Sequence, residues 1–322
     1  MRYKHFKNAN VDVSSLAVGT WGMGSADKYG NVDRNEGIEG IQAALQNGIN
    51  LIDTAPVYGW GAAEKIVGEA IKGFDRSKFM IATKCGLVST VNKPLGGVNT
   101  NREATYKNIM REAYVSLQLL GTDYIDFYLI HWPDPVTDPA ETMSALNVLK
   151  KRGIIRFIGL SNHNEEQIAA FQEWGQIDVI QPPYSMVARR DTGLMKWCYE
   201  RGIDSLTYGS LGAGILTGAI REIPKFENER DIRNTFYDFY REPKFSKVME
   251  LLKVMDEIAA AHGKPVAQVA INWSTQQDFV GTALVGLANA EQAIENCSAF
   301  DWELTADEIA RLNSELDRLE IG

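Results

Sequence analysis

Short apolar segments alternate with helical patterns eight times along this chain of 322 residues. Each apolar segment has the length of a strand, and the residues after it repeat their apolar positions at helical spacing. Strands that alternate with helices favour a parallel sheet, and eight such units favour closure. We therefore predict an α/β fold, a (β/α)8 TIM barrel, with residues 1–322 in a single domain. The predicted strands cover residues 16–19, 49–53, 79–84, 125–130, 154–160, 177–181, 203–208 and 282–285.

Three segments add to or interrupt this alternation. Residues 1–13 alternate polar and apolar side chains around Asn8-Ala9-Asn10, a pattern typical of a β-hairpin that could plug the closed end of a barrel. The helix after the third strand is expected over residues 101–120. A long polar segment, 219–242, follows the seventh strand. Loops of this length are often lids, so we expect it to close over a bound ligand.

Charge and hydropathy exclude several classes of protein. The formal net charge is −9, which argues against a general affinity for nucleic acid or for an anionic membrane surface. No apolar run is long enough to span a bilayer, and the charged N-terminus lacks the apolar stretch of a secretory signal. The three cysteines, Cys85, Cys198 and Cys297, lack the spacing of metal ligands. We expect reduced thiols, no bound metal and a cytoplasmic location.

Most of the predicted strands end in a polar or otherwise special residue. Taken alone, each has an ordinary explanation: Lys84 is solvated, His131 is structural, and Asp53 caps a turn. Closure of a parallel barrel changes this interpretation, because it brings the carboxyl ends of all strands to one mouth, where the active sites of such barrels lie. The residues concerned are Asp53, Lys84, His131, Ser161, Asn162, Gln181, Tyr208, Gly209 and Ser210.

A tyrosine joins this mouth through the turn that follows the second strand. The strand stops at Asp53, and the turn contains a proline and ends at Tyr58. A phenol becomes a better acid when a nearby cation favours the phenolate, and Lys84 is the cation that the mouth offers. Asp53 can pair with Lys84 and keep it charged. We therefore expect Lys84 to lower the pKa of Tyr58, and His131 to donate a hydrogen bond to a carbonyl oxygen.

Other catalytic arrangements find little support in the sequence. No second carboxylate pair suggests glycoside hydrolysis, no G-x-S-x-G elbow follows a strand, and no His, Cys and Asp cluster has the spacing of a metal site. A barrel lyase that used Lys84 as a Schiff-base amine is a rival interpretation. Asp53 opposes it, because a paired carboxylate keeps the amine protonated.

Several segments resemble the aldo-keto reductase family in order and spacing, over nearly the whole chain. They are Gly19-Thr20-Trp21-Gly22, Asp53-Thr54-Ala55-Pro56-Val57-Tyr58-Gly59, Lys84, His131-Trp132-Pro133, Gly159-Leu160-Ser161-Asn162 and Tyr208-Gly209-Ser210-Leu211. The pattern is most similar to the bacterial branch that includes an inositol-associated reductase. The resemblance implies a (β/α)8 barrel and a nicotinamide cofactor bound without a Rossmann domain. It also implies that Tyr58 is the general acid/base, that Lys84 and Asp53 tune it, and that His131 orients the carbonyl.

The same resemblance assigns cofactor contacts position by position. Ser161, Asn162 and Gln181 would bind the carboxamide, whose donors and acceptors their side chains match. Tyr208 would stack on the nicotinamide ring. Backbone N–H groups of the turn that begins at Gly209 would approach the pyrophosphate. The full set is Thr20, Trp21, Ser161, Asn162, Gln181, Tyr208, Gly209, Ser210, Leu211 and Gly212, with Gly286, Ala288, Gln292 and Asn296 at the adenosine end.

Two departures from the family pattern bear on the choice of cofactor. Ala288 stands where many relatives place a basic residue, and Ala213 stands where an arginine is frequent. A cation at the first position would bind the extra 2′-phosphate of NADP, so its absence favours NAD(H), with NADP(H) as the alternative. Arg230 or Arg233 on the long segment could substitute for the missing cation.

Three tryptophans, Trp21, Trp60 and Trp132, are expected to wall the substrate site. Aromatic walls beside His131 would suit the C–H faces of a sugar or polyol. The predicted function is an NAD(P)-dependent oxidoreductase that interconverts a small-molecule carbonyl and an alcohol, with no nucleic-acid or membrane partner. The alternative is a nucleotide-sensing regulatory subunit of the same fold, like the channel-associated members of the family. No extra segment precedes the predicted hairpin, which we expect to count against that alternative.

Overall fold

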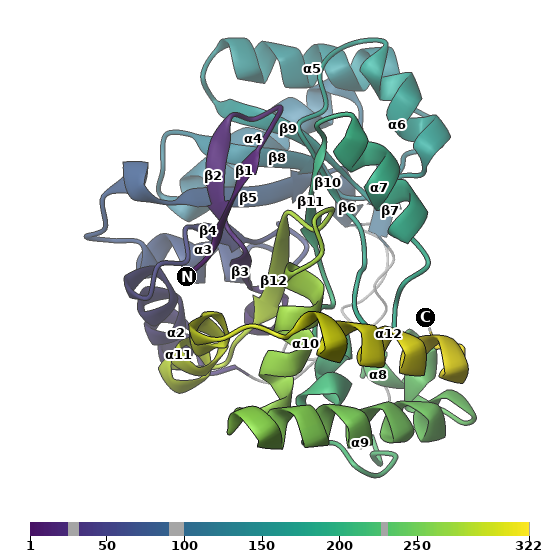
Figure 1. The fold of residues 1–322 in the computed structure, drawn as a ribbon. Helices are drawn as coiled ribbons and strands as arrows, with labels where there is room; N and C mark the ends of the chain where they lie inside the picture. The colour runs from purple at the N-terminus through teal and green to yellow at the C-terminus, as the bar shows by residue number, and fades with distance from the viewer. Residues whose placement is uncertain (25–31, 90–99, 227–230, 322) are drawn as a thin grey trace.

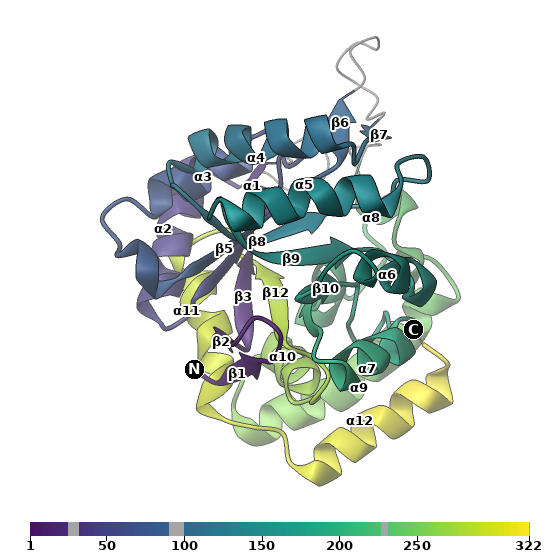
Figure 2. The same cartoon turned by 90° about the horizontal axis from the view of Figure 1, so that it is seen from above.

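Eight parallel strands close into a barrel in the computed structural model, which describes residues 1–24, 32–89, 100–226 and 231–321. Each strand pairs with the next along the chain, and β12 returns to β3. Figure 1 and Figure 2 show these strands enclosed by helices. The predicted barrel is therefore confirmed. Its strands are β3 (Leu16–Gly19), β4 (Leu51–Asp53), β5 (Met80–Cys85), β8 (Ile125–Ile130), β9 (Ile155–Ser161), β10 (Val179–Gln181), β11 (Asp204–Thr207) and β12 (Thr282–Gly286).

Helices form the outer layer (Figure 2), and several of them begin at side-chain caps. Asp33, Thr105 and Asp138 each accept hydrogen bonds from backbone N–H groups at the start of a helix. The apolar faces of the helices share one buried core with the outward-facing side chains of the strands. These helices are α2 (Arg34–Gln46), α3 (Ala62–Ala70), α4 (Tyr106–Leu120), α5 (Pro139–Lys151), α6 (Glu165–Gln172), α7 (Thr192–Glu200), α9 (Lys244–His262), α10 (Val266–Thr275), α11 (Ala290–Cys297) and α12 (Ala306–Leu319).

The predicted N-terminal hairpin is present and closes one end of the barrel. Strands β1 (Tyr3–Phe6) and β2 (Val11–Ser14) pair in antiparallel register. Phe6 is fully buried, and its ring lies 6.2 Å from that of Phe127 inside the barrel. Burial of a phenyl ring of this size stabilises the contact by roughly 1.5–3 kcal/mol. The hairpin therefore acts as a plug, as expected.

Two connections at the opposite end differ from the simple alternation. A second hairpin, β6 (Leu87–Ser89) with β7 (Thr100–Arg102), follows β5, so the expected start of a helix at residue 101 is wrong and α4 begins at Tyr106. The long segment after β11 contains α8 (Ile232–Thr235) and a 3-10 turn, Asp238–Tyr240. Tyr240 in that turn is buried, so the end of the segment is part of the core. Closure of the remainder over a ligand stays a prediction.

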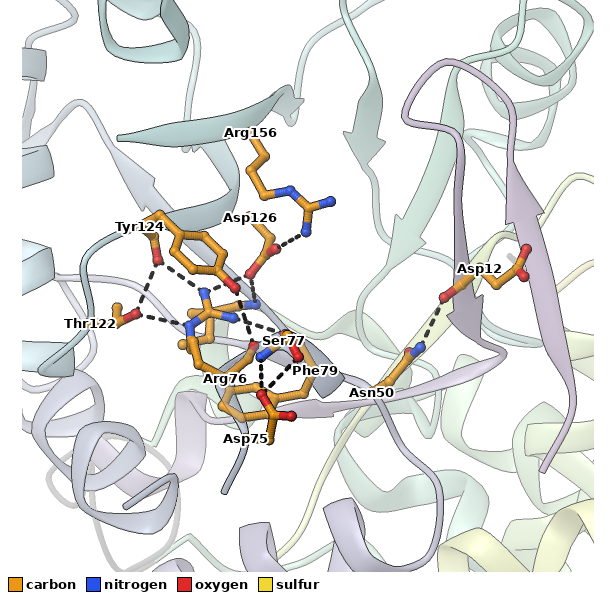
Figure 3. Close-up of polar contacts among 11 residues, drawn as sticks. Asp12, Asn50, Asp75, Arg76, Ser77, Phe79, Thr122, Tyr124, Asp126 and Arg156 are labelled. Carbon is orange, nitrogen blue, oxygen red and sulfur yellow. Dashed lines mark hydrogen bonds and ion pairs between the residues drawn. The ribbon is translucent and has the colours of Figure 1, made fainter. Parts of the chain in front are cut away.

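An ion-pair network braces the closed end of the barrel (Figure 3). Asp126, near the amino end of β8, is fully buried and accepts from Arg76 at 2.7 Å and from Arg156 at 2.6 Å. The backbone N–H of Ile81 donates to the same carboxylate at 2.9 Å. The Arg76 guanidinium lies 4.0 Å from the centre of the Tyr124 ring. We expect this network to serve stability, because the active sites of such barrels lie at the opposite end, where the carboxyl ends of the strands meet.

Candidate active site

A buried ion pair between neighbouring strands forms the centre of the mouth. Lys84 lies near the end of β5, and Asp53 ends β4. The Lys84 Nζ atom donates to both carboxylate oxygens of Asp53, at 2.9 and 2.8 Å, and to the Thr54 carbonyl oxygen at 2.9 Å. Gln181 donates to Asp53 Oδ1 at 2.7 Å. Lys84 is fully buried, so the geometry holds one ammonium group in a fixed position.

Tyr58 lies beside this ion pair, as the sequence predicted. Its hydroxyl oxygen is 3.3 Å from Lys84 Nζ, the longest of the four contacts that the ammonium group makes. An ammonium group has three protons, so Tyr58 shares a donor with the other acceptors. The His131 ring meets the Tyr58 ring edge-on, with the ring centres 5.9 Å apart. Both rings are only partly buried, so they face the mouth while Lys84 and Asp53 lie beneath them.

The ionisation of the site differs from the expectation in one respect. Burial, and then the charge of Asp53, raises the pKa of Tyr58 well above its usual value, so the expected lowering by Lys84 is wrong for the protein without a ligand. Burial, with the charge of Lys84, lowers the pKa of His131 well below its usual value. Tyr58 is therefore a neutral phenol and His131 a neutral imidazole at neutral pH. Both can donate a hydrogen bond to an oxygen atom.

The attraction between Lys84 and Asp53 opposes the effect of burial on the pKa values of both residues. Burial lowers the pKa of Lys84 and raises that of Asp53, and the attraction between the two charges opposes both shifts. The bidentate contact, the Thr54 carbonyl and the Gln181 amide together favour the charged pair. The site therefore keeps a cation within hydrogen-bond distance of the Tyr58 phenol.

The predicted carboxamide residues form a connected network at the ends of β9 and β10. Asn162 donates to the His131 carbonyl oxygen at 3.0 Å and to Ser161 Oγ at 3.1 Å. The oxygen of its side-chain amide accepts a hydrogen bond from the Tyr208 hydroxyl at 2.9 Å. Asn162 has φ of 62°, a backbone conformation that asparagine tolerates better than most residues. Through Gln181, which contacts Asp53, this network reaches the ion pair.

The turn after β11 has an unusual backbone that suits close approach of a ligand. Gly209, Gly212, Ala213 and Gly214 all have positive φ. Such turns can present N–H groups to an anion, although the Gly212 N–H already donates to the Gly209 carbonyl oxygen at 2.8 Å. Tyr240 supports the turn from the core, because its hydroxyl donates to the Ala213 carbonyl oxygen at 2.8 Å. Ser210 and Leu211 lie between these glycines, where the prediction placed them.

The predicted adenosine end lies where β12 passes into α11. Gly286 ends the strand and pairs with Gly19. Gln292 Oε1 accepts from the Ala288 N–H at 2.8 Å, and Asn289 caps the helix. Asn296 is 8 % exposed, and within the described residues its side-chain amide makes no hydrogen bond. The predicted role of Asn296 at the adenosine end stays a prediction.

Thr20 and the three tryptophans complete the predicted set, and their proposed roles stay predictions. Thr20 is fully buried and its hydroxyl donates to the Asp53 carbonyl oxygen at 2.9 Å, so its side chain braces the end of β4. Trp60 is 48 % exposed and has φ of 53°, which leaves half of the indole in solvent. Trp21 begins the short helix α1 (Trp21–Gly24) and is partly buried, as is Trp132.

Sequence reasoning missed one cation at this rim. The Arg102 guanidinium lies 5.3 Å from the centre of the Trp132 ring, and it donates to the Pro133 carbonyl oxygen at 3.2 Å. It reaches this position from β7, in the hairpin that the sequence pattern did not reveal. Hairpin strands of three residues are too short to produce a clear alternation signal.

The two arginines proposed as partners for a 2′-phosphate have different outcomes. Arg230 lies outside the described residues. Arg233 donates to the Asp231 carboxylate from Nε at 2.9 Å and from Nη2 at 2.5 Å. This bidentate pair largely neutralises the guanidinium. Arg233 is therefore paired with an acidic residue of its own segment.

The closed barrel and the group of Asp53, Tyr58, Lys84 and His131 at its mouth are those expected of an NAD(P)-dependent oxidoreductase. The chain belongs to the aldo/keto reductase family, whose sequence model, described as "Aldo/keto reductase family", matches residues 15–317. It is 35 % identical to the aldo-keto reductase YhdN of Bacillus subtilis, over 98 % of this chain and 94 % of that protein. It is 32 % identical to an NADH-specific methylglyoxal reductase of Escherichia coli, over 97 % of each.

A solved structure gives the same result. The fold matches that of a glycerol dehydrogenase from Gluconobacter oxydans with a TM-score of 0.86 and 33 % identity, over 96 % of this chain and 93 % of that one. In the part of the chain that the structure describes, no group of three His, Cys, Asp or Glu side chains is arranged to hold a metal ion. None of the described helices is both long and apolar enough to cross a bilayer.

Proposed function

We propose that this enzyme interconverts a small carbonyl compound and an alcohol, with Tyr58 as the group that moves the proton. The observation that carries the proposal is the Lys84 ammonium group, held by Asp53 and placed 3.3 Å from the Tyr58 hydroxyl. A cation at this distance stabilises the phenolate that forms when the proton leaves. The whole chain would work as one barrel domain.

The neutral forms of the two mouth residues suit the reducing direction. A nicotinamide cofactor would supply the hydride, and the amides of Gln181, Asn162 and Asn296 fit such a ligand in polarity. His131 would donate to the carbonyl oxygen and orient it. Tyr58 would donate its proton to the same oxygen as negative charge develops there. Lys84 would then stabilise the phenolate, and in the oxidising direction Tyr58 would take the proton back.

We propose that NAD(H) is the favoured cofactor and NADP(H) the alternative. The extra phosphate of NADP is dianionic, and removing such a charge from water requires a cationic partner. Ala288 provides none, and the Arg233 guanidinium is already paired with Asp231. The relative from Escherichia coli is named as NADH-specific, which supports the same preference.

We propose a sugar or polyol as the substrate class. Trp21 and Trp132 are partly buried indoles, and Trp132 lies next to His131 in the sequence. Flat apolar faces of this kind pack against C–H groups, while hydroxyl groups of the ligand need polar partners. The Arg102 guanidinium over Trp132 offers such a partner at the rim. The relative from Gluconobacter oxydans is named as a glycerol dehydrogenase, which supports a polyol.

The test is a panel of sugars, inositols, other polyols and aldehydes, each assayed with NAD(H) and with NADP(H). We expect turnover with NAD(H) and at least one sugar or polyol, and the Tyr58→Phe variant serves as the control for background oxidation. Nucleotide binding without turnover of any compound would instead support a regulatory subunit. Borohydride trapping of a carbonyl substrate on Lys84 would support the lyase.

A further inference from the structure

Tyr58 is carried by a compact loop that runs from Thr54 to the first turn of α3. Within the loop the Tyr58 N–H donates to the Ala55 carbonyl oxygen at 3.0 Å. The Ala63 N–H, already in α3, donates to the Tyr58 carbonyl oxygen at 3.2 Å. The backbone of Tyr58 is therefore joined directly to the start of the helix. Any force that positions the start of α3 also positions the Tyr58 phenol.

Two consecutive residues of β5 hold the two ends of this loop. Lys84 binds the beginning, because its Nζ atom donates to the Thr54 carbonyl oxygen at 2.9 Å. Thr83 binds the end, because its hydroxyl donates to Glu64 Oε1 at 2.9 Å. Successive side chains of a strand point to opposite faces, so Lys84 holds the loop from inside the barrel and Thr83 holds it from outside.

Burial makes the hydrogen bond between Thr83 and Glu64 a strict constraint on the position of α3. Thr83 and Glu64 are both fully buried. Burial raises the pKa of the Glu64 carboxyl. A buried hydroxyl or carboxyl oxygen that loses its hydrogen bond is penalised heavily, so few positions of α3 relative to β5 keep the bond between Thr83 and Glu64 Oε1. None of the roles described for the mouth uses either side chain.

We propose that the hydrogen bond between Thr83 and Glu64 sets the distance between the Tyr58 hydroxyl and Lys84. Thr83 and Glu64 are positioning residues, which act through the loop and touch neither substrate nor cofactor. The proposal rests on the proposed function of Tyr58. That function depends on a 3.3 Å contact that shares the Lys84 protons with three other acceptors. Such a contact is weakened by a small displacement of the loop.

Four single variants separate the hydrogen bond from charge and from packing. Thr83→Val removes the hydroxyl at nearly constant volume, and Thr83→Ser restores it. Glu64→Leu removes the acceptor, whereas Glu64→Gln keeps an acceptor oxygen and removes only the charge. We expect Thr83→Val and Glu64→Leu each to lower kcat by about 10-fold, since small misplacements of reacting groups have effects of this order or larger. Thr83→Ser and Glu64→Gln should stay within about 3-fold of the wild type.

Two further readouts separate positioning from general damage. Cofactor affinity, followed by quenching of protein fluorescence, should change by less than about 2-fold in all four variants. The crystal structure of Thr83→Val should show the distance from Tyr58 to Lys84 increased by about 0.5 Å or more, the tolerance that catalytic geometry usually requires. The double variant Thr83→Val with Glu64→Leu should be no slower than either single one, because both remove the same contact.

Several outcomes would overturn the proposal. They are a wild-type kcat in Thr83→Val, a loss in Glu64→Gln as large as in Glu64→Leu, and a fall in cofactor affinity that matches the fall in kcat. Failure of the proposed function would be recognised separately, as an absence of turnover in the wild type. The crystallographic distance in Thr83→Val then still decides the matter, and an unchanged distance counts against the proposal.

Discussion

Each end of the barrel contains a buried aspartate that pairs with a cationic side chain. The cations at the two ends differ in whether they can lose a proton. At the closed end, Asp126 is held by two arginines and one backbone N–H (Figure 3). At the mouth, Asp53 is held by Lys84, which also contacts the Tyr58 hydroxyl. A guanidinium group stays charged at any relevant pH, whereas a buried lysine can lose its proton. The closed end is therefore a fixed brace, whereas at the mouth the charge of the lysine depends on its surroundings, because burial lowers its pKa and Asp53 opposes that shift.

We therefore expect that the two ion pairs cannot replace one another. The Arg76 fork contacts Asp126, Thr122 and two backbone carbonyl oxygens, so all three of its nitrogens serve to hold segments together. The compact ammonium group of Lys84 has donors that can be redistributed when the charge of Tyr58 changes. Buried ion pairs add little net stability, although losing one partner is costly. We therefore propose that the ion pair at the mouth serves the proposed reaction.

The largest expected effect distinguishes the two aspartates. Asp126→Asn leaves two arginines around a neutral side chain, and we expect the free energy of unfolding to fall by about 3–5 kcal/mol. Asp53→Asn should lower it by less, because burial already lowers the pKa of Lys84 and the amine can deprotonate. Turnover should show the reverse order, with the greater loss in Asp53→Asn. Urea denaturation and steady-state kinetics on both variants would measure this, and equal losses of stability would break the comparison.

A new cation at the mouth should change specificity instead of stability. Ala288→Arg places a guanidinium group at the predicted adenosine end, and one charge-assisted hydrogen bond contributes about 1.5–3 kcal/mol. We expect the preference to shift towards NADP(H) by roughly 10- to 150-fold, and the gain to weaken at high salt. Ala288→Met, a longer unbranched side chain without a charge, is the control. An unchanged ratio of kcat/KM for the two cofactors would mean that the adenosine end lies elsewhere.

A smaller effect tests whether burial makes the mouth end sensitive to pH. Glu112 on α4 accepts from the Gly86 N–H, just after β5, and burial raises its pKa to about 7. The folded protein therefore binds this proton more tightly than the unfolded chain, so the resulting stability is fully present below pH ~4.5 and is lost as the pH rises through 7. Glu112→Gln should raise the free energy of unfolding at pH 8 by on the order of 2 kcal/mol and change little at pH 4.5. Equal effects at both pH values would show that Glu112 is ionised throughout.

The strands and their polar ends could be predicted because both leave a local signal. Strands buried on both faces are continuous apolar runs, and the polar residue that ends each run is visible beside it. Asp53, Lys84 and His131 were placed near Tyr58 by this argument, and the structure brings these four residues together.

The features that the sequence did not predict depend on contacts between residues that are distant in the sequence. The hairpin β6–β7 pairs short segments whose residues do not alternate. The pKa of Tyr58 is raised by burial, and the depth of burial of one side chain cannot be read from its neighbours in the sequence. Thr20 lay in a family motif, yet its hydroxyl turns to the backbone of Asp53. Contacts to backbone carbonyl groups, such as that between Lys84 and Thr54, have no sequence signature at all.

The central claim is that the hydroxyl of Tyr58, placed by Lys84, moves the proton during reduction. The most direct measurement compares Tyr58→Phe at the mouth with Tyr124→Phe at the closed end, where the hydroxyl donates to the Arg76 carbonyl oxygen. We expect turnover of the best substrate to fall by about 100-fold or more in Tyr58→Phe, with cofactor affinity nearly unchanged. Tyr124→Phe should keep the turnover of the wild type. Near-normal turnover in Tyr58→Phe would contradict the account.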